Sequence, residues 1–311
     1  MKKIKAFALF SVFAILISLT SCYFGECSVR FVHAGGTDER SVLSGMPISF
    51  EADTKEGYIF SGWYSDSEYT RPVDISGGVT KNTTLYAKYE VDYEAFSRNI
   101  SLISSAFVSV RCTSYSYVGT KPQAVSAASG SGAILKSQGG YYYVITNHHV
   151  IAGELALLRE YKVSDVYGNE YEAELIASDS SVDLALLRFK AGKEILKCLK
   201  IDTSMPDYGE AVAAIGNPLG KLNTLTFGEI KNFKEVDVVS AGSDSVNVDF
   251  KVLWHTAYME SGSSGGALIN AQMKLVGVNF ATGADTDGNF AYGFTIPSEK
   301  VSEFIGKAGL G

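Results

Sequence analysis

Three short segments contain the residue types needed for nucleophilic catalysis, in the chain order histidine, aspartate, serine. Each segment supplies one candidate, and the three candidates are His149, Asp183 and Ser264. His149 precedes Asp183 by 34 residues, and Asp183 precedes Ser264 by 81. These separations suit a chain that folds as two β-barrels, with the histidine and the aspartate in the first barrel and the serine in the second.

The three side chains form a chemically complete set. The hydroxyl of Ser264 is a poor nucleophile at neutral pH, so a neutral imidazole must take its proton during attack. His149 is the candidate base, and a buried Asp183 carboxylate on its other ring nitrogen would fix the tautomer and stabilise the imidazolium. The oxyanion of the tetrahedral intermediate needs fixed N–H donors. The backbone of Gly262 and Ser264 can supply them, because glycine-rich turns adopt conformations that other residues avoid.

Each segment taken alone has another interpretation. Gly-Ser stretches are often flexible loops, and a second one, Ser129–Gly132, occurs earlier in the chain. An aspartate before an apolar strand is often a turn residue, and a histidine pair can lie on the surface or bind a metal. However, His148 and His149 are adjacent and no cysteine pair lies close by, so we expect no metal and no cofactor. The joint pattern favours catalysis.

Six segments together resemble the trypsin-like proteases of the bacterial HtrA (Deg) group. They are Gly130–Ile134, Tyr143–Val150, Ser181–Leu187, Val212–Gly220, Thr224–Gly228 and Ala291–Pro297. In that family the residue just before the valine of the histidine segment is the base, which selects His149 over His148. The resemblance covers roughly residues 105 to 305. It implies an all-β, chymotrypsin-like double six-stranded β-barrel and a serine endopeptidase activity on proteins or peptides.

The resemblance also implies a substrate pocket. Tyr258 and Met259 are expected on one side of it, and Val278, Asn279 and Phe280 on the other. Tyr258 stands at the pocket-base position where trypsin has an acid. We therefore expect cleavage after small or apolar residues rather than after lysine or arginine.

The chain departs from the family near the serine. Ser263, Ala267 and Thr256 stand where the family has asparagine, proline and often aspartate. The first two positions carry no proton chemistry, whereas Thr256 bears on specificity and on the order of the loop. Sites of this family also occur in inactive loop arrangements. The alternative function is therefore a catalytically weak or inactive surface protein that acts in adhesion or partner binding.

The first 21 residues read as an export signal. Three lysines precede the apolar run Ala6–Ile17, which is too short for a comfortable membrane span. Leu19-Thr-Ser-Cys22 resembles the bacterial lipobox, so we expect lipidation of Cys22 and anchoring to the bacterial membrane, outside the cytoplasm. Ordinary signal cleavage and an uncleaved anchor are the alternatives.

Composition limits the partners. The formal charge of −7 becomes −10 without residues 1–21, which contain three lysines and no acid. Such an acidic chain argues against nucleic acid and against electrostatic binding to anionic lipid. Beyond Cys22, the three cysteines Cys27, Cys112 and Cys198 cannot all pair within one chain. Cys112 and Cys198 both fall in the first-barrel region, and their pairing stays open.

Residues 28–90 form a separate β-rich unit. The segments Gly57–Tyr64 and Thr83–Tyr89 resemble the core and the closing strand of the internalin-type B repeat, also called the Listeria–Bacteroides repeat. That resemblance implies a small β-grasp-like module. One copy forms no array, and we favour a spacer over an adhesion module. Trp63 and its aromatic neighbours are expected in the core.

The expected organisation has five parts. They are a lipoprotein signal peptide (1–21), a lipidated tether (22–27), the repeat module (28–90), a linker helix (91–105) and the protease domain (106–311). Residues Thr113–Ser131, rich in serine, glycine and alanine, are expected to form a flexible loop. The chain ends too soon after Pro297 for a PDZ domain, so none is expected. A homo-oligomer, a trimer by analogy, is possible.

Overall fold

The computed structural model describes residues 25–152, 158–217, 224–235, 239–241, 244–246 and 248–310. The expected signal peptide (1–21) and the lipidation site Cys22 lie outside these residues. Within the described ranges, no helix is long and apolar enough to span a membrane.

The chain divides into two compact units. The repeat unit comprises residues 25–54 and Phe60–Tyr89, and the barrel unit comprises Lys55–Ile59 and residues 90–310. Lys55–Ile59 therefore belongs with the barrels, although the sequence places it inside the 28–90 block. The reason is local contact within the barrel unit, where Ala211 N donates to the Tyr58 hydroxyl at 3.4 Å and Gln272 Nε2 donates to Glu56 O at 2.8 Å.

The repeat unit is built on one five-stranded sheet in the order β2-β1-β5-β3-β4. The strands are β1 (Glu26–His33), β2 (Gly36–Leu43), β3 (Tyr58–Tyr64), β4 (Pro72–Val73) and β5 (Thr83–Val91). A 3-10 helix, η1 (Ile75–Gly77), follows β4. Phe31 stacks on Phe50 at a centroid distance of 4.1 Å and meets Trp63 edge-on at 5.0 Å. Trp63 is buried, so these aromatics form the core of the unit, as expected.

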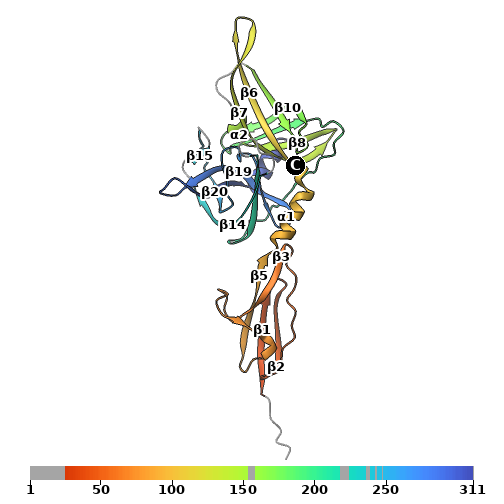
Figure 1. Cartoon of the computed structure of the whole chain (residues 1–311), viewed down its shortest axis with the longest axis vertical. Coiled ribbons are helices and arrows are strands. Elements are labelled where there is room, and N and C mark those ends of the chain that lie inside the picture. The colour runs from red at the N-terminus through yellow and green to blue at the C-terminus, as the bar shows by residue number, and fades with distance from the viewer. Residues whose placement is uncertain are drawn as a thin grey trace, which may run out of the picture. The chain divides into compact units, whose positions relative to one another are not determined.

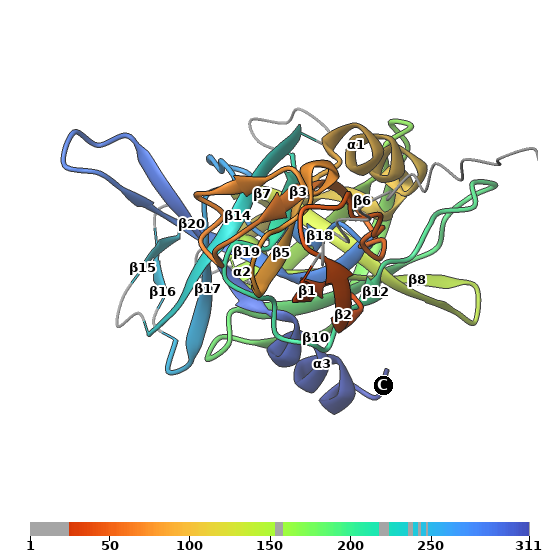
Figure 2. The ribbon, with the colours of Figure 1, turned by 90° about the horizontal axis from the view of Figure 1, so that it is seen from below.

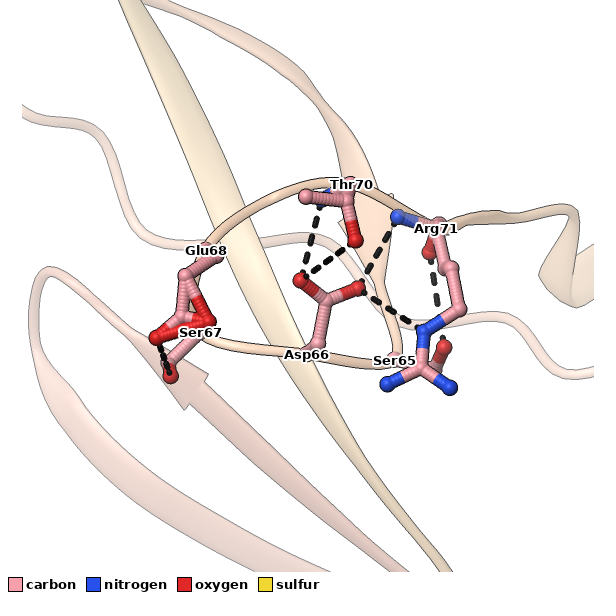
Figure 3. A network of polar contacts seen from close by, with 6 residues as sticks. All are labelled: Ser65, Asp66, Ser67, Glu68, Thr70 and Arg71. Carbon is pink, nitrogen blue, oxygen red and sulfur yellow. Dashed lines mark hydrogen bonds and ion pairs between the residues drawn. The ribbon is translucent and has the colours of Figure 1, made fainter.

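A polar turn joins β3 to β4. Figure 3 shows the Asp66 carboxylate directed at Thr70 and Arg71. One oxygen accepts from the backbone N and the hydroxyl of Thr70, at 3.0 and 3.1 Å, and the other accepts from Arg71 N at 2.9 Å. These backbone hydrogen bonds hold the pKa of Asp66 below its usual value. The loop is a structural element of the repeat rather than a separate site.

Six strands close the first barrel, in the order β10-β11-β8-β7-β6-β9. They are β6 (Phe107–Val118), β7 (Lys121–Gln138), β8 (Tyr141–Thr146), β9 (Leu158–Ser164), β10 (Glu170–Asp179) and β11 (Leu184–Phe189). Val108, Val110, Ile134 and Val144 are fully buried in its core. The inward-facing side chains of the six strands fill the interior of this closed sheet.

The prediction of a flexible loop at Thr113–Ser131 is wrong. These residues form the far part of the β6–β7 hairpin, which is antiparallel from Thr113↔Ala127 to Val118↔Lys121 with one register shift between Ser114 and Tyr115. Figure 1 shows this hairpin projecting beyond the first barrel. Small residues dominate β7, but β6 brings tyrosines opposite them, and Gly119 takes the positive φ of 64° that the turn requires.

The second barrel also has six strands. They are β13 (Ala211–Gly216), β14 (Thr224–Glu235), β17 (Lys251–His255), β18 (Ala267–Asn270), β19 (Lys274–Ala284) and β20 (Phe290–Pro297). Pairing of β19 with β20 closes the barrel. The short strand β12 (Lys200–Ile201) adds to β19 in parallel, and β15 (Val239–Ala241) pairs with β16 (Asp244–Val246). The predicted all-β fold with a chymotrypsin-like pair of six-stranded barrels is confirmed.

Three α-helices accompany the barrels, and a 3-10 turn, η2 (Ser104–Ala106), leads into β6. α1 (Tyr93–Leu102) lies in the expected linker, yet it packs on the barrels through the buried Phe96, whose ring meets Phe227 at 5.2 Å. α2 (His148–Ala152) carries the histidine segment, and α3 (Ser298–Lys307), which the sequence did not predict, follows β20. Figure 2 shows α1 and α3 on opposite sides of the barrel unit.

Candidate active site

His149 and Asp183 are joined by two hydrogen bonds. The buried strand β8 ends at Thr146, and α2 then places His149 opposite the turn that precedes β11. Asp183 Oδ2 lies 2.8 Å from His149 Nδ1, and Oδ1 accepts from His149 N at 2.9 Å. The side chain of Asp183 is 1% exposed and that of His149 13%. An acceptor at Nδ1 leaves the Nε2 lone pair available as a base.

Asp183 adopts a conformation that brings its backbone to the same place. Its φ is 50°, in the left-handed region that aspartate tolerates better than most residues. As a result its carbonyl accepts from His148 N at 3.1 Å and from Asn147 Nδ2 at 2.9 Å, beside the two bonds of its carboxylate. One residue therefore fixes the whole start of α2.

His148 is engaged elsewhere. Its Nδ1 lies 2.6 Å from the hydroxyl of Ser178 on β10, whereas His149 faces the aspartate. The side chains of the two adjacent histidines therefore have different partners, Ser178 for His148 and Asp183 for His149.

Ser264 lies in the turn between β17 and β18. Gly262 and Gly265 have φ values of 95° and 82°, which suit glycine, and Gly265 N donates to Asn279 O at 2.8 Å. The Ser264 hydroxyl lies 3.4 Å from Phe280 O, to which it donates. Among the described residues it makes no hydrogen bond to His149.

Packing nevertheless places the serine turn against the histidine segment. Gly130, on β7, lies between them, because a Cβ there would fall 2.7 Å from a methyl group of Val150 and 2.8 Å from Ser264 O. Gly265 is equally close to the end of β8, since its Cβ would fall 2.3 Å from Thr146 Oγ1. The two barrels therefore bring the three predicted residues to one side of their interface.

The two backbone N–H groups predicted for an oxyanion hole make no hydrogen bond within the described part of the chain. Neither Gly262 N nor Ser264 N donates to a protein acceptor there, whereas Ser263 N between them donates to Glu260 O at 2.9 Å. Glu260 N in turn donates to Ser263 Oγ at 3.2 Å. The serine that replaces the family's asparagine thus closes the turn on Glu260.

The predicted pocket residues divide into two groups. Tyr258, half exposed, and Asn279 do line a small pocket beside Ser263, together with Glu260 and with residues of β13 and β14. The side chains of Met259, Val278 and Phe280 are buried in the apolar core and are not among the residues that line this pocket. Their part in substrate binding stays a prediction.

A buried polar chain beneath the serine turn escaped the sequence analysis. His255 Nε2 lies 2.9 Å from Thr295 Oγ1, which donates to Asn279 Oδ1 at 2.8 Å. Burial lowers the pKa of His255 to about 3, although the backbone of Ala257 acts in the opposite direction. The imidazole is therefore neutral and donates to the threonine. A histidine at the end of the apolar run Val252–Trp254 was the available signal.

The described residues contain neither a metal-binding cluster nor a disulfide bond. No group of three or more histidine, cysteine, aspartate or glutamate side chains there could hold a metal ion. Cys27, Cys112 and Cys198 are free thiols, and Cys112 Sγ donates to Ile151 O at 3.4 Å.

Comparison with known proteins agrees with this geometry. Residues 130–278 match the family model of the trypsin-like peptidase domain, and residues 28–88 match that of the Listeria-Bacteroides repeat domain.

Curated relatives cover the barrel region. The serine protease Do-like HtrA of Bacillus subtilis is 38% identical over 180 residues, which are 56% of this chain and 38% of that protein. The periplasmic serine endoprotease DegP of Escherichia coli K12 is 33% identical over 177 residues, 56% of this chain and 34% of that protein. The chain thus spans little more than a third of the length of these relatives. Its barrel unit is similar to the trypsin-like peptidase domain of HtrA and DegP proteases, which supports a serine endopeptidase.

Proposed function

We propose that the chain is a serine endopeptidase in which Ser264 is the nucleophile, His149 the general base and Asp183 the residue that orients the base. The observation that carries this proposal is the pair of hydrogen bonds that the Asp183 carboxylate accepts from His149, beside a glycine-rich turn that presents Ser264. A buried carboxylate on Nδ1 is what a neutral imidazole needs if it is to accept a proton at Nε2.

The reaction begins with a side-chain rotation. Ser264 Oγ turns from Phe280 O toward His149 Nε2, which takes the hydroxyl proton as Oγ attacks the peptide carbonyl carbon. The imidazolium is stabilised by Asp183, and the oxyanion accepts hydrogen bonds from Gly262 N–H and Ser264 N–H. His149 then protonates the leaving amine, an acyl-enzyme forms on Ser264, and water activated by His149 releases it. The residues themselves supply every proton transfer, so the mechanism needs no cofactor.

The orientation of the Ser264 hydroxyl favours a second candidate. A hydroxyl engaged with Phe280 O fits a resting arrangement, and a chain that never leaves it would be a binding protein on a protease scaffold. Catalytic hydrogen bonds are often long or misaligned without substrate, so this geometry alone does not exclude activity. Turnover decides between the two candidates.

The test is hydrolysis of an unfolded protein, such as casein, by the wild-type chain and by Ser264→Ala and His149→Ala. We expect each substitution to reduce turnover by a factor of about 10⁴ to 10⁶. His148→Ala is the matched control and should retain activity, because the His148 side chain contacts Ser178, whereas its hydrogen bond to Asp183 O comes from the backbone, which the substitution keeps. Equal activity of Ser264→Ala and the wild type would contradict the proposal.

For specificity we propose cleavage after small or apolar residues. The support is Tyr258, which the family resemblance places at the pocket base and which lines the small pocket beside Ser263, with its ring 5.0 Å from that of Phe290. Glu260 is the acid nearest the serine turn, and it lines the small pocket beside Ser263. A peptide library cleaved mainly after lysine or arginine would overturn this proposal and would identify Glu260 as the counter-charge.

We further propose an extracytoplasmic location by way of a lipid on Cys22. The support is the lipobox-like segment Leu19–Cys22 together with the DegP relatives, which are named as periplasmic. Labelling of the expressed chain with a fatty-acid analogue, compared with Cys22→Ala, tests this. Labelling that persists in the variant would contradict it.

The repeat unit is proposed to act as a spacer rather than as an adhesion module. Its large aromatics Phe31, Phe50 and Trp63 pack on one another, as in a core. The test compares the binding of host cells or glycans by the isolated barrel unit with that by the full chain. If the repeat is a spacer, the two should bind equally; stronger binding by the full chain would indicate adhesion. An assembly into a homo-oligomer, a trimer by analogy, is tested by light scattering of the full chain.

A further inference from the structure

Ser131, on strand β7 of the first barrel, contacts the serine turn of the second barrel with both its backbone and its side chain. We propose that Ser131 is a positioning residue, which holds the backbone of Gly262 and Ser264 in the shape that an oxyanion hole requires. The proposal deepens the proposed function and rests on it, because it concerns the geometry of the same reaction.

Four hydrogen bonds of Ser131 carry the proposal. Ser131 Oγ donates to Gly262 O at 2.7 Å, and Ser131 N donates to Ser264 O at 2.8 Å. The same hydroxyl accepts from Asn217 N at 2.7 Å, and Ser131 O accepts from Thr146 Oγ1 at 2.7 Å. Ser131 thereby connects the strand before His149, the serine turn and the end of β13.

The serine turn packs closely on this residue. Ser131 is completely buried. A Cβ on Gly265 would fall 2.1 Å from Ser131 O, so the turn lies directly on the strand. The turn is therefore seated on the first barrel through Ser131, whereas the Gly262 and Ser264 N–H groups stay free of protein acceptors within the described residues.

Glycine at position 262 makes such an anchor necessary. Its φ of 95° is accessible to glycine, but glycine also populates other regions at little cost, so the peptides on either side of it can reorient. Fixing the carbonyl of Gly262 fixes the peptide that follows it, and fixing the carbonyl of Ser264 fixes the other end of the turn. The peptide that carries Ser264 N–H lies between these two anchored peptides, and Gly262 N–H is held through the anchored peptide on the other side of the same residue, so both donors need less reorganisation during the reaction.

The hydroxyl of Ser131 has no spare donor. A serine hydroxyl has one hydrogen, and Gly262 O takes it, while Asn217 N occupies one of the two lone pairs. Ser131→Ala removes both bonds and keeps the backbone bond to Ser264. The variant therefore tests the anchoring of Gly262 separately from the fold of β7.

The experiment compares Ser131→Ala with Ser298→Ala in the full chain. Ser298 is the matched control because it is also a buried serine whose hydroxyl donates to a backbone carbonyl, that of Asp202, at the start of α3. Measurements are the kcat and KM for a peptide substrate, inhibition by a peptide boronate that forms a tetrahedral adduct, inhibition by the product peptide, and the midpoint of thermal unfolding.

We expect Ser131→Ala to lower kcat by about 10- to 100-fold, less than the loss of a direct oxyanion donor, with little change in KM. The inhibition constant of the boronate should rise by a similar factor, whereas that of the product peptide should not. Ser298→Ala should stay within about twofold of the wild type in every kinetic constant. A kcat within about twofold of the wild type in Ser131→Ala, or equal losses of boronate and product binding, would overturn the inference.

Hydrogen exchange of residues 258–266 separates this inference from the proposed function. If the wild-type chain shows no Ser264-dependent turnover, the proposed function fails, and exchange still tests the anchor. Faster exchange of this segment in Ser131→Ala than in Ser298→Ala supports the role of Ser131. Equal exchange in the two variants overturns it, whatever the activity.

Discussion

Asp183 combines an orienting role with a structural one. Its carboxylate contacts His149 twice, and its carbonyl, turned by a φ of 50°, accepts from His148 and Asn147. The chemistry of the base and the start of helix α2 therefore depend on the same residue. The sequence predicted the pairing with His149, but it could not predict the left-handed backbone, because an aspartate before an apolar strand has several turn conformations open to it.

At this residue we predict that Asp183→Asn lowers kcat by about 10⁴-fold while the protein stays folded. An amide that donates to Nδ1 would favour the tautomer with its hydrogen on Nε2, so the base could no longer accept the serine proton. Steady-state hydrolysis and circular dichroism measure the two effects. Ser178→Ala, which removes only the partner of His148, should retain activity; similar losses in both variants would contradict the assignment.

His255 provides a prediction on pH. Its pKa is about 3 in the folded chain and 6.5 when unperturbed, so between these values the unfolded state binds a proton that the folded state excludes. The free energy of unfolding should therefore decrease as the pH falls from 6.5 toward 3, by up to about 1.4 kcal/mol per pH unit.

Replacement of His255 should remove this dependence. His255→Gln keeps an N–H donor for Thr295 and has no group that titrates in the window. Urea unfolding at several pH values should give curves for the wild type and the variant that converge as the pH falls. Parallel curves would show that His255 is not buried as a neutral group. His148→Gln, at a partly exposed histidine, is the control.

The secondary-structure elements show where sequence patterns are sufficient and where they are not. The two barrels and the linker helix were predictable from apolar strands and family-like motifs. The Thr113–Ser131 hairpin was not, because its β7 half consists of small residues that carry little strand preference and gain order from tyrosines across the pair. α3 was not predicted, because few stretches of the sequence show a sustained helical period, although Val301 and Phe304 are buried on this helix.

Sequence patterns were also insufficient for the substrate pocket. Family resemblance placed five residues around it, but the side chains of Val278 and Phe280 are buried on β19, and that of Met259 is buried in the loop between β17 and β18. Alternation along a strand decides which face each side chain takes, and a motif does not specify that direction when both faces are apolar.

Helix α1 gives a prediction at the scale of the element. Phe96→Ala should destabilise the barrel unit by about 3–5 kcal/mol, since its ring is buried against Phe227 and the gap cannot be filled. Leu102→Ala, in the last turn of the same helix and 69% exposed, should change stability little. Chemical denaturation measures both, and equal effects would mean that α1 is a free linker.

The far part of the β6–β7 hairpin gives a second prediction at the scale of the element. Pairing of β6 with β9 ends at Tyr115↔Leu158, and Tyr117 and Val118 beyond it are exposed. Replacing residues 116–123 by a two-residue Asn-Gly turn should therefore leave the thermal midpoint of the barrel unit within a few degrees of the wild type. Loss of the folded state would show that the tip contributes to the barrel core.

The whole molecule consists of a repeat unit and a barrel unit, and one segment of the sequence repeat belongs to the barrels. Lys55–Ile59 contributes Tyr58, whose burial raises its pKa, and Gly57, whose Cβ would fall 2.5 Å from that of Ala271. No sequence boundary between 28 and 90 predicts this, because the contact joins residues more than 200 positions apart.

Deleting residues 28–90 should therefore destabilise the barrel unit in addition to removing the repeat. We expect a lower thermal midpoint than in the full chain, and a similar decrease in Tyr58→Ala, which leaves the repeat in place. Differential scanning calorimetry resolves the barrel transition in both. An unchanged midpoint in the deletion would mean that Lys55–Ile59 adds nothing to the barrels.

The central claim is that Ser264 is a nucleophile activated by His149. Reaction with a fluorophosphonate, followed by peptide mass spectrometry, tests it most directly, because the probe forms a covalent bond with an activated serine. We predict one adduct, on Ser264, which is absent in Ser264→Ala and strongly reduced in His149→Ala but not in His148→Ala. Labelling of another residue, or equal labelling of the wild type and Ser264→Ala, would contradict the claim.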